Sequence, residues 1–171
     1  KQNKSSGRFY KEMIDHVRKV LEDPAKVCPE YDKAAGYEIA GFAWFQGWND
    51  ATDGVTYTKE TPGGFDLYTK LLAHFIRDVR KDLDAPKMPF VIGVLGHDGL
   101  HTPEDRAQGK SYFRDAQAAT AQLPEFKGNV FTVQTGRFYD PELKRLDWKW
   151  GEVKRYRNQL KGKSKEEVAA A

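Results

Sequence analysis

The chain has 171 residues, a length typical of one compact domain that can bury a hydrophobic core. Hydrophobic residues make up 39% and charged residues 31%, and no apolar run approaches the roughly 18 residues that span a bilayer, which argues against a membrane-embedded or disordered protein. The net charge of +3 comes from residues 142–171, where nine Lys and Arg stand against five Asp and Glu. A charge cluster of this size usually forms a solvated helix face, and nucleic-acid binding is the weaker alternative.

The N-terminal sequence, KQNKSSGRFYKEM, lacks the apolar segment of a signal peptide and does not begin with Met, so we expect that processing or truncation set this start. The sequence therefore leaves the cellular compartment open. The single cysteine, Cys28, excludes an internal disulfide and a multi-cysteine metal site. We interpret it as an unpaired loop thiol, with a catalytic role as the weaker alternative.

The first quarter of the chain predicts a helix and a strand. Over residues 9–21, apolar side chains recur at the three-and-four spacing of one helix face, with Ser5 or Ser6 as the N-cap. Residues 37–45 (YEIAGFAWF) predict a short apolar strand bounded by turn residues. Residues 49–64 carry no sustained period, so we expect a loop at the end of that strand.

The rest of the chain alternates helices and strands. The predicted elements are a helix over 65–83, a strand over 89–95, a polar loop over 96–109, a helix over 112–123, a strand over 129–135 and a last helix over 140–160. Asp140 and Pro141 are a good N-cap and first-turn pair for the last helix. Residues 161–171 give no packing signal and predict a flexible tail.

Strands that alternate with helices at this spacing predict right-handed βαβ units and a mostly parallel sheet between helices, an α/β fold with three α/β/α layers. The chain shows no internal repeat and no linker, so we expect residues 1–171 to form a single domain. In such sheets ligands bind beyond the carboxyl ends of the strands. Three polar stretches follow the strands there: WFQGWND at 44–50, GHDGLH at 96–101 and TGRFYD at 135–140.

With these strand ends, nearly the whole chain resembles the sialate O-acetylesterase-like carbohydrate esterases of the SGNH hydrolase superfamily. The similarity is carried by residues 36–50 (GYEIAGFAWFQGWND), 68–96 (YTKLLAHFIRDVRKDLDAPKMPFVIGVLG) and 112–135 (YFRDAQAATAQLPEFKGNVFTVQT). In that superfamily a Gly-x-Asn-Asp block follows a central strand, and residues 47–50 match it. The sugar-esterase branch often has Trp-x-Gln-Gly-Glu there, and this sequence has Trp48 in place of the Glu. The resemblance implies an SGNH-hydrolase fold of flavodoxin-like type.

The resemblance also implies that Gln46, Gly47 and Asn49 form an oxyanion hole. Attack on an acetyl ester develops negative charge on the carbonyl oxygen, and a neutral donor held beside it stabilises the transition state by about 3 kcal/mol. Trp48 and Asp50 are then expected to contact the substrate. The alternative is that the two amides only satisfy loop backbone, as buried amides commonly do.

A serine hydrolase also needs a nucleophile on a strand-to-helix turn and a histidine base. None of the four serines stands in a Gly-Asp-Ser or Gly-Gln-Ser-Asn setting, so the resemblance implies a partial domain whose serine block lies upstream of Lys1. Asp98-Gly-Leu-His101 spells the Asp-x-x-His pattern of the family's last block, which makes His101 a candidate base. In the family that block should follow the strand at 129–135, so the alternative is a base beyond Ala171.

Two further patterns concern ligands. Arg114 and Gln117 resemble an Arg-x-x-Gln signature of the family and are candidates for substrate contact, with a helix-surface or salt-bridge role as the alternative. Residues 49–60 loosely match a calcium loop, but Ala51 fails at its third position and a strand rather than a helix precedes it. We therefore expect no metal and no cofactor.

The resulting hypothesis is a sialate-type carbohydrate O-acetylesterase that acts by a serine-hydrolase mechanism in the parent protein, with this chain inactive by itself. The expected partner is an acetylated carbohydrate, without nucleic acid or membrane, and the oligomeric state is open. The alternative is a noncatalytic carbohydrate-binding or scaffold domain with the same fold. The resemblance also suggests an extracellular or periplasmic location.

Overall fold

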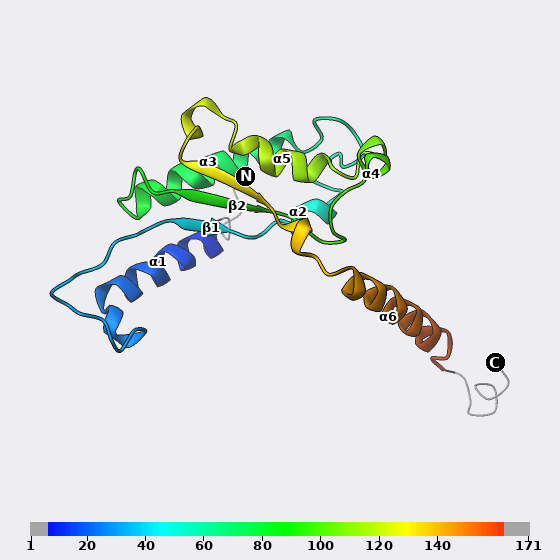
Figure 1. Ribbon diagram of the computed structural model, residues 1–171, viewed down its shortest axis with the longest axis horizontal. Coiled ribbons are helices and arrows are strands. Elements are labelled where there is room, and N and C mark those ends of the chain that lie inside the picture. Colours follow the sequence, from blue (N-terminus) through cyan, green and yellow to red (C-terminus); the bar gives the residue numbers. More distant parts are fainter. Residues whose placement is uncertain (1–6, 163–171) are drawn as a thin grey trace.

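The computed structural model describes residues 7–162 and contains a three-stranded parallel sheet (Figure 1). The strands are β1 (Phe42–Trp44), β2 (Phe90–Val94) and β3 (Val130–Gln134), in the spatial order β1-β2-β3. Trp44 is paired with Ile92, and Ile92 with Thr132. The predicted strands at 89–95 and 129–135 are confirmed to within one residue at each end.

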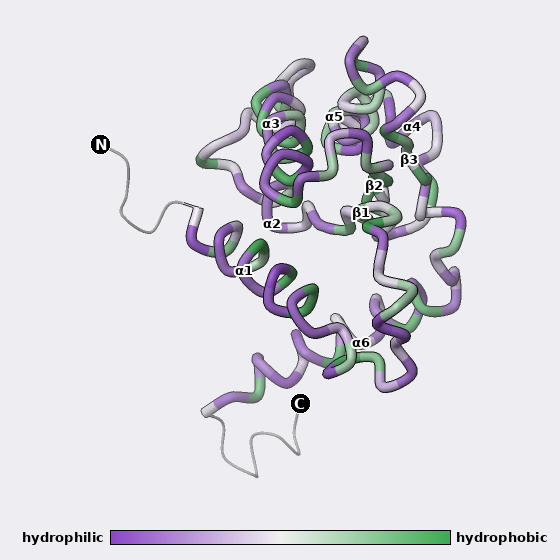
Figure 2. The backbone as a smooth tube through the Cα atoms, turned by 90° about the vertical axis from the view of Figure 1, so that its left-hand side faces the viewer, coloured by the Kyte–Doolittle hydropathy of each residue, from purple (hydrophilic) through white to green (hydrophobic). Residues whose placement is uncertain are grey.

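Two crossover helices cover one face of this sheet. α3 (Asp66–Asp82) connects β1 to β2, and α5 (Tyr112–Thr120) connects β2 to β3. Both views of the chain place these helices side by side on the same face (Figures 1 and 2), as expected for two successive right-handed crossovers. The predicted α/β class is confirmed: the sheet is all-parallel and consistent with a three-layer fold of SGNH type.

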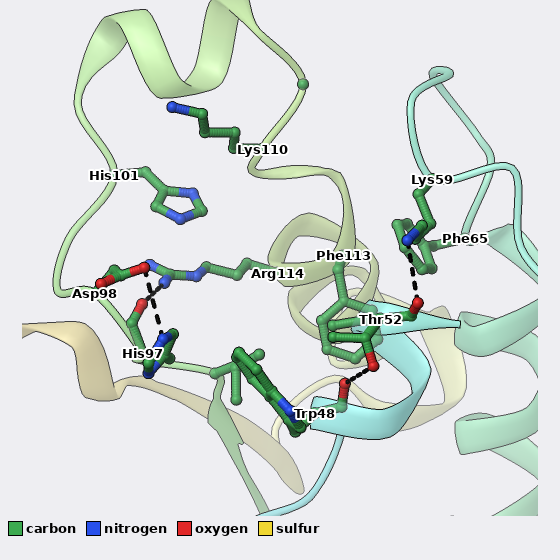
Figure 3. A pocket seen from close by; sticks show the side chains of 13 residues that line it. Trp48, Thr52, Lys59, Phe65, His97, Asp98, His101, Lys110, Phe113 and Arg114 are labelled. Carbon is green, nitrogen blue, oxygen red and sulfur yellow. Dashed lines mark hydrogen bonds and ion pairs between the residues drawn. The ribbon is translucent and has the colours of Figure 1, made fainter. Parts of the chain in front are cut away.

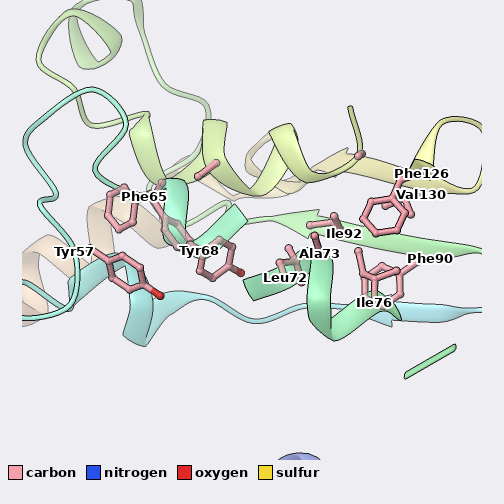
Figure 4. Packing of buried hydrophobic residues seen from close by; sticks show 13 residues of the cluster. Tyr57, Phe65, Tyr68, Leu72, Ala73, Ile76, Phe90, Ile92, Phe126 and Val130 are labelled. Carbon is pink, nitrogen blue, oxygen red and sulfur yellow. The ribbon is translucent and has the colours of Figure 1, made fainter. Parts of the chain in front are cut away.

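The main core lies between the sheet and these two helices (Figure 4). Phe90 and Ile92 of β2 have no exposed surface, and Ile76 of α3 packs against them. Phe126, from the turn that precedes β3, closes the core near the start of the strands. β2 is the central strand, and its residues alternate between fully buried (Phe90, Ile92, Val94) and half-buried (Val91, Gly93).

The first helix, α1 (Arg8–Glu22), packs against α3 and forms a smaller core around Ile14 and Val79. Tyr10 donates a 2.6 Å hydrogen bond from Oη to Asp82 of α3. The helix was predicted correctly, but its N-cap is Gly7, which has no side chain to cap with. Ser5 and Ser6 lie outside the described residues.

Three details of the sequence prediction are wrong. The strand predicted over 37–45 is shortened to β1, because its partner strand is preceded by Pro89, which accepts from Phe42 but has no N–H to extend the ladder. The predicted loop at 49–64 contains a short helix, α2 (Trp48–Thr52). The predicted loop at 96–109 contains α4 (Pro103–Ala107), whose N-terminus is closed by a reciprocal cap between Thr102 and Asp105.

The last helix, α6 (Pro141–Gln159), begins as predicted, with Asp140 accepting from the backbone N–H of Glu142. It has no buried residue and extends away from the sheet (Figure 1). Of the predicted tail, only Lys161 and Gly162 lie within the described residues. None of the helices within residues 7–162 has the length and apolar character needed to cross a membrane.

Candidate active site

β1 ends in a sharp turn, and the residues predicted to form the oxyanion hole lie on it. Gly47 makes the turn with a φ of 144°, and α2 begins at the next residue. Only glycine adopts this φ readily. A Cβ atom at this position would lie 2.7 Å from Cζ of Phe113, so Gly47 also lets the chain pass close to α5. We call residues 46–49 the corner.

Two side-chain amides at the corner are accessible. Asn49 is exposed, and its side chain has no hydrogen-bond partner within residues 7–162. Gln46 is also exposed, and its Nε2 donates to Asp50 over 3.3 Å. The other carboxylate oxygen of Asp50 accepts from Tyr57 Oη at 3.3 Å. Asp50 therefore orients the Gln46 side chain by accepting its hydrogen bond, while the Asn49 side chain can donate to a ligand.

Beside these amides is a small hollow. Its volume is about 330 Å³, and it is lined by Phe45, Gln46, Gly47, Trp48, Asn49, Gly93 and Leu95. The hollow lies at the carboxyl ends of β1 and β2, where ligands bind in open parallel sheets. We call it the corner hollow. Gln46 also lines a neighbouring hollow with Asp50 and Tyr57, the side to which its amide donates.

A second, cationic cavity of about 390 Å³, shown in Figure 3, shares Trp48 and Leu95 with the corner hollow as lining residues. Its basic lining residues come from two parts of the sequence, Lys59 from one and His97, His101, Lys110 and Arg114 from the other. Asp98 is the one carboxylate among the described lining residues, and it lies 3.6 Å from His97 and 3.8 Å from Lys144. The cavity therefore suits an anionic ligand.

Two histidines in this cavity are held in different ways. The His97 ring packs edge-on against Trp48, with the ring centroids 4.7 Å apart. His101 Nδ1 lies 2.9 Å from Ser111 Oγ. Burial, and then the positive charge of Arg114, lower the pKa of His101, so its imidazole is held neutral near pH 7. A neutral imidazole can accept a proton, as a general base must.

Ser111 is not placed to act as a nucleophile, although it is hydrogen-bonded to a histidine. Its residue surface is only 3% exposed, so an ester carbonyl cannot reach its hydroxyl group. The hydrogen bond instead fixes the His101 ring, which leaves Nε2 as the other ring nitrogen for a ligand. No sequence pattern predicted this pair, because it depends on the packing of α5 against the loop at 96–109.

Arg114 and Gln117 were both predicted to contact substrate, and the structure separates them. Arg114 lines the cationic cavity, and its guanidinium donates to the carbonyl oxygens of His97 and Gly99. Gln117 has no exposed surface, so a substrate cannot touch it in this structure. Its side chain instead lies beneath the corner, bonded to the backbone of Gln46 and Leu95.

The structure thus separates the predicted residues: Gln117 is buried, and Asp50 lines a further hollow with Gln46 and Tyr57, away from the two spaces described above. Gln46, Gly47 and Asn49 line the corner hollow, whereas His101 and Arg114 line the cationic cavity. Trp48 and Leu95 line both. Lys59 and Lys110 were not predicted from the sequence, because each comes from a loop whose place is set only by the packed helices.

The loop at 49–60, which loosely matches a calcium loop, does not arrange its side chains as calcium ligands. Asp53 Oδ1 accepts from the backbone N–H groups of Val55 and Thr56, which is the geometry of a local turn. In the part of the chain that the structure describes, no group of three or more His, Cys, Asp or Glu side chains could hold a metal ion.

Comparison with known protein families places most of the chain in one of them. A family model described as carbohydrate esterase, sialic acid-specific acetylesterase, matches residues 1–141. No curated protein and no solved structure matches the chain. The matched segment includes β1, β2, β3 and every residue that lines the two spaces around Trp48.

Proposed function

Because the chain belongs to the carbohydrate esterase family of sialic acid-specific acetylesterases, we propose that the protein containing it removes O-acetyl groups from sialate-type sugars by a serine-hydrolase mechanism. The observation that carries this proposal is the corner: two accessible amides, Asn49 and Gln46, line one hollow at the carboxyl end of β1. Neutral donors in such a place suit the developing charge of an ester carbonyl in acyl transfer.

In the proposed reaction, a serine from a segment outside residues 7–162 attacks the acetyl carbonyl carbon. Asn49 Nδ2 and Gln46 Nε2 donate to the oxyanion, with a backbone N–H of the corner as a third donor. The serine hydroxyl gives up its proton as it attacks, the carbon–oxygen bond to the sugar then breaks, and the leaving sugar oxygen takes that proton and becomes a hydroxyl. Water, which gives up a proton in turn, then attacks the acyl-serine and releases acetate, and the serine oxygen is protonated again. A histidine carries these protons; His101 is one candidate, and a histidine outside the described residues is the other.

The cationic cavity supports an acidic sugar as the substrate. A sialate carries a carboxylate, and Arg114 could pair with such a group while Trp48 packs against the ring, whereas the Lys110 ammonium is already paired with Asp105 at 2.7 Å. Trp48 and Leu95 line both spaces, so one sugar could reach the cavity with its carboxylate and the corner hollow with its acetyl ester. Asp50, which binds Gln46 and Tyr57, is proposed to orient the amide and not to touch the sugar.

The test uses the protein with its native termini and an O-acetylated sialic acid, with release of acetate as the readout. Asn49→Ala should lower kcat roughly 100- to 1000-fold with KM little changed, because it removes a donor that acts on the transition state. Asn158→Ala, an exposed Asn on α6, is the matched control. Residues 1–171 alone should be inactive, and turnover by that chain that is lost on Asn49→Ala would contradict this expectation.

A noncatalytic carbohydrate-binding domain is the second candidate. It is favoured by one observation: Ser111, the serine that the structure describes beside a histidine, is buried. Under this alternative the native protein forms no covalent adduct with a fluorophosphonate. It would also retain the sugar after Gln46→Ala and Asn49→Ala.

A further inference from the structure

The side chain of Gln117 joins the ends of two strands from inside the protein. Its Oε1 accepts from the backbone N–H of Leu95 at 2.8 Å, and its Nε2 donates to the carbonyl of Gln46 at 3.1 Å. Gln117 belongs to α5, so these contacts cross 22 and 71 positions of sequence. One fully buried amide therefore connects the helix layer to β1 and β2 at the edge of the sheet that holds the corner.

These bonds replace pairing that the sheet no longer supplies. The ladder between β1 and β2 ends with Trp44 and Ile92. Beyond it the chain turns at Gly47, and the carbonyl of Gln46 and the N–H of Leu95 would face a buried side chain without partners. Both bonds are partly buried, and backbone groups withdrawn from water are almost always paired, because an unpaired one loses its bond to water without compensation. The Gln117 amide supplies one acceptor for the Leu95 N–H and one donor for the Gln46 carbonyl, so both backbone groups are paired.

The fit around Gly47 shows how closely the corner follows this helix. A Cβ at Gly47 would lie 3.0 Å from Nε2 of Gln117 and 2.7 Å from Cζ of Phe113. Gln117 and Phe113 are four residues apart on α5 and so lie on the same helix face. The corner therefore packs directly against one turn of α5. Gln117 holds the Gln46–Gly47 peptide in place through its hydrogen bond to the Gln46 carbonyl.

We infer that Gln117 is a positioning residue that holds the Gln46–Gly47 peptide, and through it the Asn49 amide, in the geometry that an oxyanion hole requires. It acts without touching the substrate, unlike the contact role that its sequence pattern implied. This inference rests on the proposed function for its catalytic consequence. Oxyanion stabilisation depends on donors that are already oriented, and small displacements of a positioned group can cost a hundredfold in rate.

The test is Gln117→Glu, which keeps the size and shape of the side chain. A protonated carboxyl can accept from Leu95 and donate to Gln46, so both bonds can form. An ionised carboxylate only accepts and would repel the Gln46 carbonyl. The variant should therefore have near-wild-type kcat at low pH and lose at least tenfold in kcat as its carboxyl ionises, with KM little changed. Gln117→Met, which can form neither bond, should be slow at every pH.

Gln122→Glu is the matched control, because Gln122 is exposed just after α5 and receives the same change of charge. It should leave the pH profile of the wild type unchanged. A Gln117→Glu enzyme whose pH profile matches that of the Gln122→Glu control would overturn the inference.

A second readout keeps the inference testable if the esterase proposal fails. In Gln117→Glu, the NMR signals of the Gly47 and Trp48 amides and of the Asn49 side chain should shift with ionisation of the introduced carboxyl. Low pH, where both bonds can form, provides the folded reference for this variant. Corner signals that do not respond would refute the positioning role. Corner signals that shift in a protein without esterase activity would uphold the positioning role and refute the proposed reaction.

Discussion

Gly47→Ala should lower the free energy of unfolding far more than the same change at another glycine with a positive φ and open space around it. The new Cβ would lie 2.7 Å from Cζ and 2.9 Å from Cε1 of Phe113, closer than Cβ atoms come to other atoms in real structures. Phe113 cannot move aside easily, because its ring packs edge-on against Phe65 at 5.1 Å and Tyr68 at 4.7 Å. Overpacking of this kind costs roughly 1–3 kcal/mol, and a φ of 144° adds roughly 1–3 kcal/mol of backbone strain.

Gly128→Ala is the matched control for this comparison. Gly128 also has a positive φ, 86°, but no atom lies within 4 Å of its added Cβ. Gly128→Ala should lower the free energy of unfolding by about 1 kcal/mol, because strain in the left-handed region is partly offset by the lower entropy of the unfolded alanine chain. The assay is urea unfolding followed by tryptophan fluorescence, with extrapolation to water. Equal losses for Gly47→Ala and Gly128→Ala would refute the argument that α5 supports the corner.

Two further substitutions test the surroundings of the site and of the core. Burial, and then Asp50, raise the pKa of Tyr57 to about 12, above the usual 10, so the folded chain holds this proton more tightly than the unfolded chain. The resulting stability is fully present below pH 10 and is lost as the pH rises toward 12, and Tyr57→Phe should make the measured free energy of unfolding fall less over that range. Arg80 is 8% exposed and donates to Met88 and Asn129 at the start of the strands. A lysine has a single ammonium group and cannot make these hydrogen bonds from two nitrogens at once. Arg80→Lys should therefore lower the free energy of unfolding, measured with urea, by about 3 kcal/mol.

The elements that the sequence predicted well are those whose apolar pattern and tertiary burial agree. α3 has a clear helical period, and Leu72, Ile76 and Val79 on that face are all buried. β2 is a continuous apolar run, as expected for a central strand with both neighbours present. The predictions failed where the deciding contact lies elsewhere in the chain, as with Pro89, which limits the length of β1.

The short helices were missed for a different reason. α2 and α4 have five residues each, too few for a hydrophobic period to appear. α4 did carry a local signal, because Thr102, Pro103 and Asp105 are a cap, a first-turn proline and its reciprocal partner. α2 carried none, since its start depends on the unusual backbone of Gly47, which α5 accommodates.

Of the candidate site, the sequence predicted which residues lie at the corner but not what surrounds them. Gln46 and Asn49 follow an apolar strand, and the ends of parallel strands are places where ligands bind. The contact of Gln117 with the corner and the shared cavity of Lys59 and Lys110 were not predicted. Both depend on how the helices pack, and no sequence pattern links the segments involved.

Asn49 and His101 line two different spaces, with Trp48 common to both, and this bears on which histidine is the base. Catalysis requires one reacting atom within about 3 Å of both the nucleophile and the oxyanion donors, with the base in reach of the nucleophile's proton. Asn49 lines only the corner hollow and His101 only the cationic cavity, so these two groups do not face the same space in this structure. His101→Gln should therefore raise KM for an acidic sugar and leave kcat nearly unchanged, with His16→Gln on the exposed face of α1 as its control. A loss in kcat as large as that of Asn49→Ala would instead make His101 the base and require Trp48 to move when substrate binds.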